Sequence, residues 1–187
     1  MERIFNLFSR FPEIEEDAKI AFASKLQILE LERGDLVEKA GEVCDHLYLV
    51  AEGSLRSFYY KDNKDITVSF ALEGEFTTSM YSFISRQPGY ENIEAMESST
   101  VGKISYEELR ELFETHPILE RAYRIILEQY YIALEEQLIF TKFKSAKERY
   151  LSLMESRPKI IHKASVGQIA SFLDMSIETL SRIRGKI

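Results

Sequence analysis

The sequence predicts an α+β fold in which an N-terminal antiparallel β-roll is followed by a long helix and a small helix-turn-helix domain. Three observations predict it: many short strand-like segments separated by turns, a run over 118–140 without Gly or Pro, and two short amphipathic helices at the C-terminal end. With 187 residues, 45% of them hydrophobic, the chain can bury one good core and a smaller second one. We therefore expect a β-roll with N-terminal helices over 1–117, a dimerisation helix over 118–141 and a helix-turn-helix domain over 142–187.

The first two thirds of the sequence alternate between strand-like and turn-like residues. We expect helices over 2–9 and 14–24 and strands over 26–31, 46–51, 54–60, 66–72, 93–96 and 100–104. Gly34, Gly41 and Gly53 each end a strand segment, and the run KDNKD over 61–65 has the composition of a hairpin loop. Short strands with regular turns are typical of a barrel or roll.

The run over 118–140 predicts one long helix with two apolar sides. Its first stripe has the spacings of a heptad repeat and consists of Leu119, Tyr123, Ile126, Tyr130 and Ala133. Its second stripe consists of Ala122, Ile125, Ile132 and Leu138. Such a helix can pack on the roll with one side and on a partner chain with the other. The alternative is a single helix buried in the core.

The last stretch, residues 166–187, predicts two short helices joined by a tight turn. The apolar stripes consist of Ile169, Ala170 and Leu173 on the first helix and of Leu180 and Ile183 on the second. Asp174 occupies the turn, where such motifs need a positive φ, and Asp is among the few non-glycine residues that tolerate it. Ser176 stands at the N-cap of the second helix, where its hydroxyl can accept from the backbone N–H of Glu178 or Thr179.

The polar face of the second helix has the chemistry of a major-groove reader. Arg182 can donate a bidentate pair to guanine, Glu178 can accept from cytosine, and Ile177 can contact a thymine methyl group. Groups at the helix N-terminus can contact phosphate. The expected DNA-binding residues are Ser176, Ile177, Glu178, Thr179, Ser181 and Arg182. The alternative is an ordinary solvated helix on which Glu178 and Arg182 form an ion pair four residues apart.

Charge is unevenly distributed along the chain. Residues 142–187 hold ten Lys and Arg against four Asp and Glu, a net charge of +6, while the whole chain carries −7 and residues 1–141 therefore −13. A basic end on an acidic chain favours phosphate binding by that end, with the acidic remainder facing away from DNA. The alternative is a basic surface without a partner.

Several classes of protein are disfavoured. No apolar run approaches the roughly 20 residues that span a bilayer, and the N-terminus does not resemble a signal peptide, so we expect a cytoplasmic protein that does not bind membranes. Cys44 is the only cysteine, which excludes a disulfide framework within the chain, and we interpret it as a small buried side chain. Without a phosphate-binding loop, a metal-ligand cluster or a nucleophile paired with a base, we expect no enzyme, no catalytic residue, no metal and no cofactor.

The segment over 31–53 (LERGDLVEKAGEVCDHLYLVAEG), followed by Gly74, Glu75 and Phe76, resembles the cyclic-nucleotide-binding jelly roll. Joined to the C-terminal motif, it resembles the Crp-Fnr family of bacterial transcription regulators. The resemblance implies a homodimeric sequence-specific DNA-binding regulator with RNA polymerase as a partner. Its two recognition helices would lie about one DNA turn, ~34 Å, apart on a palindromic site.

The resemblance also guides the region between the long helix and the motif. Residues 143–145 can form a hinge and 146–155 a helix that Pro158 ends. Many family members have a two-stranded wing after this helix. Because only about ten residues follow before the motif, we expect the wing to be reduced or missing.

The resemblance is weakest at the ligand site. Gly74 and Glu75 match the family's glycine-glutamate turn, but Gly89 and Tyr90 stand where an arginine and a hydroxyl residue are expected. A buried phosphate without a cation would lose several kcal/mol, so we do not expect cyclic AMP as the effector. Arg86 is the nearest substitute cation. We therefore take Gly74, Glu75 and Arg86 as the candidate ligand-binding residues of an unidentified small molecule.

Two other ligand sites and one other function stay open. A pocket for an effector could be bordered by Phe70, Phe76, Tyr81 and Phe83, although these aromatics fit a core better than a ligand site, and the roll could also bind no ligand. Haem is disfavoured because no histidine has a partner at ligand spacing; the three are His46, His116 and His162. The alternative function is a small-molecule sensor whose basic C-terminal helices bind a protein instead of DNA.

Overall fold

The computed structural model describes Phe8 and residues 11–187, and divides into two compact units. Unit 1 consists of Met1–Ser57 and Ala71–Leu127, and unit 2 of Phe58–Phe70 and Glu128–Ile187. The helix predicted over 2–9 lies outside the described residues apart from Phe8. The dividing point falls inside the long helix, so the predicted boundaries at 117 and 141 stay predictions.

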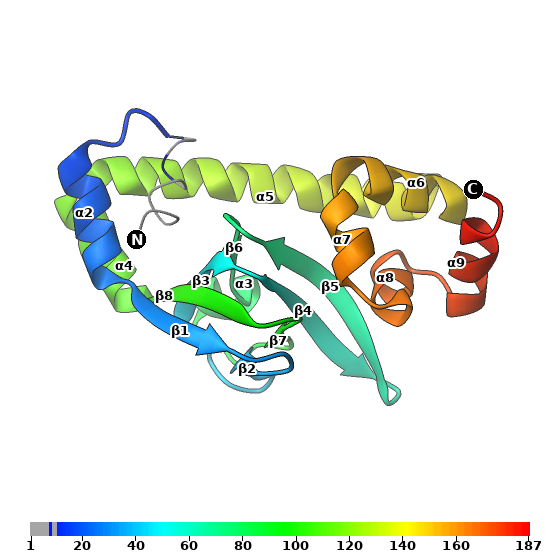
Figure 1. The fold of residues 1–187 in the computed structure, drawn as a ribbon. Coiled ribbons are helices and arrows are strands. Elements are labelled where there is room, and N and C mark those ends of the chain that lie inside the picture. The colour runs from blue at the N-terminus through cyan, green and yellow to red at the C-terminus, as the bar shows by residue number, and fades with distance from the viewer. Residues whose placement is uncertain (1–7, 9–10) are drawn as a thin grey trace. The chain divides into compact units, whose positions relative to one another are not determined.

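The described strands form two four-stranded sheets, and the strand pairs with a determined register are antiparallel, as the sequence predicts (Figure 1). The first sheet has the order β1 (Gln27–Leu31), β8 (Ser99–Ser105), β3 (His46–Glu52), β6 (Phe76–Thr77). The second has the order β2 (Leu36–Glu38), β7 (Asn92–Ala95), β4 (Ser54–Lys61), β5 (Lys64–Leu72). The α+β fold with an antiparallel roll is thereby confirmed.

The core of the roll consists of alternate residues from strands of both sheets. Val50, Ile93 and Val101 are completely buried in it, together with Leu55. Turns with positive φ connect the strands, which the predicted glycines make possible. The KDNKD loop also has positive φ at both central residues, 51° at Asp62 and 60° at Asn63, as a two-residue type I′ hairpin requires.

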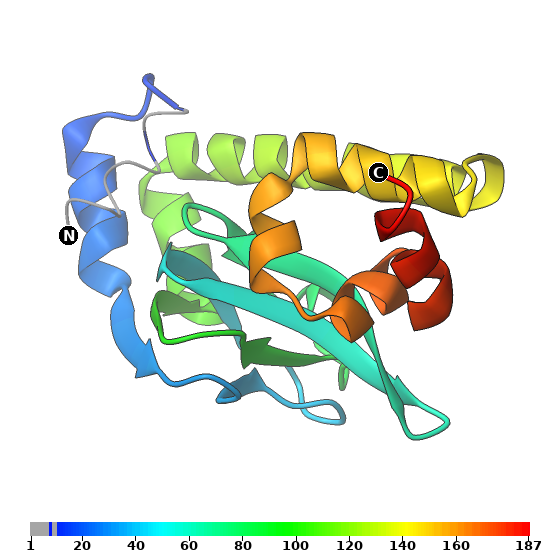
Figure 2. The same ribbon diagram turned by 45° about the vertical axis from the view of Figure 1, so that its right-hand side comes forward.

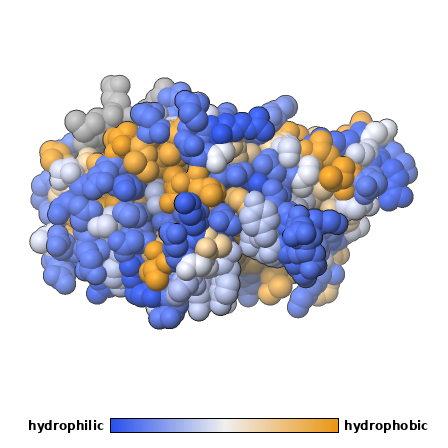
Figure 3. Space-filling view, turned by 90° about the horizontal axis from the view of Figure 1, so that it is seen from below, coloured by the Kyte–Doolittle hydropathy of each residue, from blue (hydrophilic) through white to orange (hydrophobic). Residues whose placement is uncertain are grey.

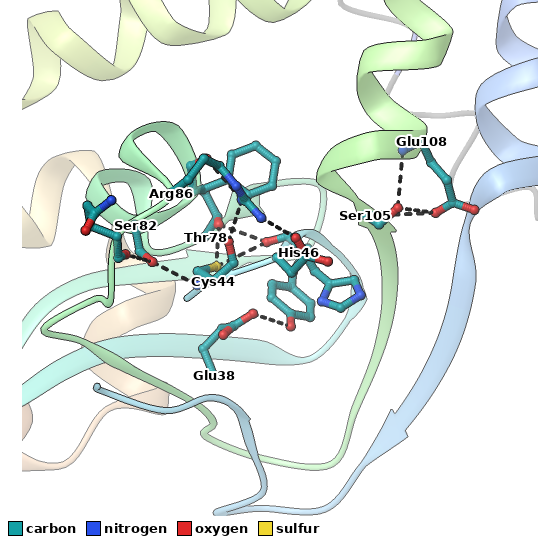
Figure 4. Close-up of polar contacts among 12 residues, drawn as sticks. Glu38, Cys44, His46, Thr78, Ser82, Arg86, Ser105 and Glu108 are labelled. Carbon is teal, nitrogen blue, oxygen red and sulfur yellow. Dashed lines mark hydrogen bonds and ion pairs between the residues drawn. The ribbon is translucent and has the colours of Figure 1, made fainter. Parts of the chain in front are cut away.

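Helices form a second apolar cluster in unit 1. They are α2 (Glu16–Lys25), α3 (Met80–Ser85), α4 (Tyr106–Thr115) and the first part of α5 (Pro117–Phe143). Phe22, Leu112 and Leu119 are each at most 5% exposed in this cluster. Ser105 begins α4 with a capping box, in which its hydroxyl accepts from the backbone N–H of Glu108 while that carboxylate accepts from the Ser105 N–H (Figure 4).

The environment of α5 changes along its length. Its first turns are covered, because Leu119 and Ala122 are buried in unit 1. Beyond residue 128 large apolar side chains are exposed, and Tyr131, Leu134 and Leu138 recur at spacings of three and four with exposures of 65%, 46% and 58%. The alternative of a helix buried along its whole length is therefore wrong. The N-terminal members of both predicted stripes pack on the helix's own unit, and the contact of the remaining members with a partner chain stays a prediction.

Unit 2 continues with four short helices. They are α6 (Ala146–Ser156), α7 (Pro158–Lys163), α8 (Val166–Phe172) and α9 (Ile177–Arg184). Pro158 starts α7, a position where its missing N–H removes no helical hydrogen bond. Residues 143–187 are all described and contain no strand, so α7 occupies the place where a wing would lie.

Hydrophilic residues cover most of the face seen in Figure 3, and apolar residues form separate patches on it. Among the described residues, no helix combines the length and apolar character needed to cross a membrane. Cys44 is 1% exposed, which confirms the prediction of a buried side chain, and burial raises the pKa of its thiol to about 11.

Gly53→Ala is expected to destabilise the protein much more than Gly34→Ala. Both glycines have φ of +92°, but a Cβ at Gly53 would lie 2.8 Å from the Ser99 Cα, whereas none of the described atoms lies within 4 Å at Gly34. We expect a loss of about 3 kcal/mol for the first variant and about 1 kcal/mol for the second, measured by urea unfolding. Equal losses would contradict the close contact between Gly53 and Ser99.

Candidate nucleic-acid interface

Helices α8 and α9 form the predicted pair and are joined by a tight turn (Figure 2, orange and red). The stripes expected to pack do so: Ile169 and Leu180 are completely buried, and Ala170 is 2% exposed. Residues of α6 and α7 complete this small core, among them Leu153 and Ile160. Burial of these apolar residues fixes which sides of α8 and α9 remain at the surface.

The turn has the geometry that the sequence predicts. Asp174 has a φ of +50°, and the N–H of Met175 donates to the Ala170 carbonyl at 3.0 Å. At the start of α9, the Ser176 hydroxyl accepts from the backbone N–H of Thr179 at 3.2 Å. The positive φ and the N-cap are thus confirmed, and together they set the direction in which α9 leaves the turn.

Arg149 of α6 holds the turn in place, a role that sequence reasoning missed. Its Nε donates to the Leu173 carbonyl at 2.8 Å and its Nη2 to the Asp174 carbonyl at 3.0 Å, while Nη1 donates to the Lys144 carbonyl at 2.9 Å. The planar guanidinium thereby joins the end of α5, α6 and the α8–α9 turn.

The side of α9 that faces solvent presents the predicted reading residues. Ile177 is 51% exposed, and Glu178, Ser181 and Arg182 are exposed as well. Within the described residues no ion pair joins Glu178 to Arg182, whose Nη2 instead donates to the Thr179 hydroxyl at 3.4 Å. The Ser176 hydroxyl and a backbone N–H at the helix start lower the pKa of Glu178, so its carboxylate is charged at neutral pH.

The opposite side of α8 packs on the β4–β5 hairpin within unit 2. The Thr67 N–H donates to the Ser171 hydroxyl at 3.2 Å, and the rings of Phe70 and Phe172 meet edge to face with centroids 5.1 Å apart. Arg157 Nη1 also donates to the Phe70 carbonyl at 3.2 Å. The hairpin therefore supports the first helix of the motif and leaves the solvent-facing side of α9 exposed.

The three candidate ligand residues each have a structural role within unit 1. Gly74 has a φ of +83°, and the carboxylate of Glu75 accepts from the Leu72 N–H at 3.0 Å, so both serve the turn before β6. Arg86 pairs with Asp45, donates to the Cys44 carbonyl at 3.0 Å and lies over an aromatic ring (Figure 4). A ligand would have to displace these contacts, and the assignment of all three residues stays a prediction.

The region that lacks the family arginine has an unusual polar group. The Ser79 hydroxyl is buried and has no hydrogen-bond partner among the described residues, and a Cβ at Gly89 would lie 2.9 Å from it. Tyr90 points to the surface, where its ring lies 5.2 Å from that of Tyr81. Burial raises the pKa of Glu91, so the local environment already disfavours a negative charge.

The predicted aromatic pocket is wrong. Its proposed members were Phe70, Phe76, Tyr81 and Phe83. Phe70 belongs to unit 2 and stacks on Phe172, while Tyr81 is 49% exposed. Phe70 and Phe83 are core residues, which confirms the alternative for those two. In the part of the chain that is described, no group of three or more His, Cys, Asp or Glu residues could hold a metal.

Comparison with known proteins agrees with this architecture. The family model for the cyclic nucleotide-binding domain matches residues 28–116. Electron transport regulator A of Shewanella oneidensis is 22% identical over 168 residues, and the fumarate and nitrate reduction regulatory protein of Vibrio cholerae 24%. Each match covers 83% of this chain and 66% of the relative, so the chain spans about two thirds of these curated relatives. The chain is a homologue of the Crp and Fnr regulators.

Solved structures show the same fold for this Crp-Fnr homologue. The c-di-GMP responsive global regulator CLP of Xanthomonas campestris has a TM-score of 0.73 and 19% identity, covering 92% of this chain and 91% of that one. A putative Crp/Fnr regulator of Eubacterium rectale has the same TM-score and identity, covering 97% and 87%.

The Crp-Fnr homologue is also similar to a protein of a different kind. Neuropathy target esterase sws of Drosophila willistoni is 27% identical over 125 residues, which are 63% of this chain and 8% of that protein. Sequence similarity alone therefore does not decide the function, and the C-terminal motif has to carry that argument.

Arg149→Lys is expected to loosen the α8–α9 turn of the Crp-Fnr homologue. Lysine keeps the charge, but its three donors sit on one nitrogen and it lacks the planar guanidinium fork, so it cannot reproduce the three separate contacts to the Lys144, Leu173 and Asp174 carbonyls. We expect a loss of about 1 to 2 kcal/mol in unfolding free energy and faster amide hydrogen exchange over 171–176. Lys147→Arg, at an exposed position of the same helix, is the control. Unchanged exchange over 171–176 in Arg149→Lys would refute the role of the guanidinium.

Proposed function

We propose that the protein is a homodimeric, sequence-specific DNA-binding transcription regulator of the Crp-Fnr type. The observation that carries the proposal is the exposed side of α9, where Glu178 and Arg182 are not paired with each other. Because these two charged groups lie on one side of the helix and do not neutralise each other, both are available to form hydrogen bonds with base edges. The net charge of +6 over residues 142–187 supplies attraction to phosphate.

Each residue of the motif has a role in the proposed complex. Arg182 donates to guanine O6 and N7, Glu178 accepts from cytosine N4, and Ile177 contacts a thymine methyl group. Ser176, Thr179 and the N-terminal amides of α9 contact phosphate and set the depth of insertion. Ser181, on the same side as Arg182, contacts a base edge or the backbone next to it.

The exposed second half of α5 supports the proposed dimer. Tyr131, Leu134 and Leu138 form an apolar stripe at heptad spacing, and apolar stripes of this kind are rarely left in water. A two-fold axis along this stripe would pair two α9 helices about one DNA turn, ~34 Å, apart on a palindromic site. RNA polymerase as partner and a cytoplasmic location are part of the same proposal, because both follow from acting on the bacterial chromosome.

We also propose that the effector is not cyclic AMP. The position of the expected phosphate-binding arginine holds Gly89, and Glu91 beside it would repel a phosphate when ionised. Arg86, the nearest cation in the sequence, is occupied by Asp45 and by backbone carbonyls. A small molecule of different chemistry is therefore the better candidate for an effector.

Arg182→Ala is expected to weaken binding to the selected DNA site by about 1 to 3 kcal/mol and to relax preference at one base pair per half-site. The site would first be selected from random duplexes and affinities measured by gel shift at fixed salt. Arg33→Ala removes the same charge from an exposed position of unit 1 and should leave the affinity unchanged.

Two outcomes would contradict this assignment. Equal weakening on all sequences would reduce Arg182 to a phosphate contact. Failure to enrich any sequence would sink the regulator and favour the alternative, a sensor whose basic helices bind an acidic protein.

Leu138→Glu is expected to raise the dissociation constant of the dimer by at least about tenfold, because it places a charge within the apolar stripe. Sedimentation equilibrium measures the effect. The control is Ile20→Glu, which introduces the same charge at an isoleucine of α2 that is 55% exposed. A wild-type chain that is monomeric at all concentrations would overturn the proposed dimer.

A further inference from the structure

A pocket of about 190 Å³ lies in unit 1 between α3, α4 and the first half of α5. Half of its eight lining residues are aromatic, namely Phe83, Tyr106, Phe113 and Tyr123. Among the residues predicted to bind DNA or a ligand, Phe83, from the predicted aromatic pocket, lines it, and the predicted DNA-binding residues and Gly74, Glu75 and Arg86 do not. The pocket therefore has no role in the function proposed above.

The aromatic wall is held in place by contacts of its own. Phe83 and Tyr106 meet edge to face with centroids 5.3 Å apart, and Phe113 and Tyr123 lie 5.2 Å apart. The guanidinium carbon of Arg86 lies 4.2 Å from the centroid of the Tyr106 ring, so Tyr106 is also held by a cation–π contact. Phe83 is 2% exposed and belongs to the core. Such a wall is preformed, as small-molecule sites usually are.

One cation stands at this apolar pocket. Arg110 of α4 lines it, is exposed, and forms no hydrogen bond or ion pair with a described residue. Glu107 and Glu114, one helical turn away on either side, are not within ion-pair distance of it. Burial raises the pKa of Tyr123, so its phenol also keeps its proton and can donate a hydrogen bond. The site thus has hydrogen-bond donors for an anion, and no described residue neutralises the positive charge of Arg110.

We propose that this pocket binds a single-ring aromatic carboxylate, with the ring among the aromatic side chains and the carboxylate on the guanidinium of Arg110. The size fits this class. A cavity of ~150 Å³ can hold benzene, and the additional volume of this pocket leaves room for a small polar group on the ring. Nucleotides and other drug-sized ligands usually occupy roughly 300 Å³ or more. The planar fork of arginine matches the two oxygens of a carboxylate.

Isothermal titration calorimetry on the full chain tests the proposal, with benzoate and phenylacetate as probes and benzamide as the neutral analogue of benzoate. We expect at least one acid to bind with one site per chain. We expect benzamide to bind about tenfold more weakly than benzoate if benzoate is the better acid, because it lacks the charge-assisted hydrogen bonds. Equal binding of benzoate and benzamide, or no binding of either acid, overturns the proposal.

Two pairs of variants locate the site. Arg110→Gln should weaken acid binding about tenfold, while Arg121→Gln, which removes an exposed arginine that does not line the pocket, should not. Ile84→Trp places a larger side chain at the pocket from a position that is 56% exposed and should abolish binding, while Ile20→Trp, 55% exposed on α2, should not. Because exposed residues are changed, circular dichroism should show each variant folded. Binding that survives both pocket variants places the acid elsewhere and refutes the site.

Discussion

The functional arrangement depends on the complete burial of Ile169 and Leu180 in the small helical core of unit 2. Once these two side chains are buried, the helical repeat determines which residues of α8 and α9 face the solvent. Asp174 and Ser176 then set the angle at which the second helix starts, and Arg149 fixes the turn to α6. The exposed residues of α9 are thus positioned by apolar residues that would not contact DNA.

The same logic operates on α5 at a larger scale. Leu119 and Ala122 are covered by unit 1, whereas Tyr131 and Leu138 are not covered by any described residue to a comparable degree. A helix with 27 residues does not need tertiary contacts at every turn to persist, but exposed apolar residues in water favour association. One element can therefore belong to a folded core at one end and present an association surface at the other.

The sequence allowed prediction of the elements in which apolar residues repeat at a regular spacing. The strands of five or more residues and the two motif helices were predicted because alternation and helical spacing are visible over that length. β2 and β6, with three and two residues, are too short to show alternation, and α3 has only six residues. The capping box from Ser105 to Glu108 was a visible signal for α4 that the prediction did not use.

The geometry around the candidate site could be predicted where it is local and was missed where it is not. Ser176 and Asp174 act on their own neighbours in sequence, so their roles could be predicted. Arg149 binds backbone carbonyls more than twenty residues away, and carbonyls leave no trace in a sequence. The aromatic pocket failed for a related reason, since hydrophobicity does not say which unit a phenylalanine such as Phe70 will join.

The chemistry of Cys44 gives the molecule a built-in reporter. With a pKa of about 11 and contacts to Thr78 and His46, only about one thiol in a thousand is ionised at pH 8, and the sulfur is closed to solvent. Cys44 is buried in the helix cluster of unit 1, so a thiol reagent can modify the folded chain only when this cluster opens. Because the chain has no other cysteine, the rate of modification measures how often the cluster opens, and a bound ligand that stabilises it would lower that rate.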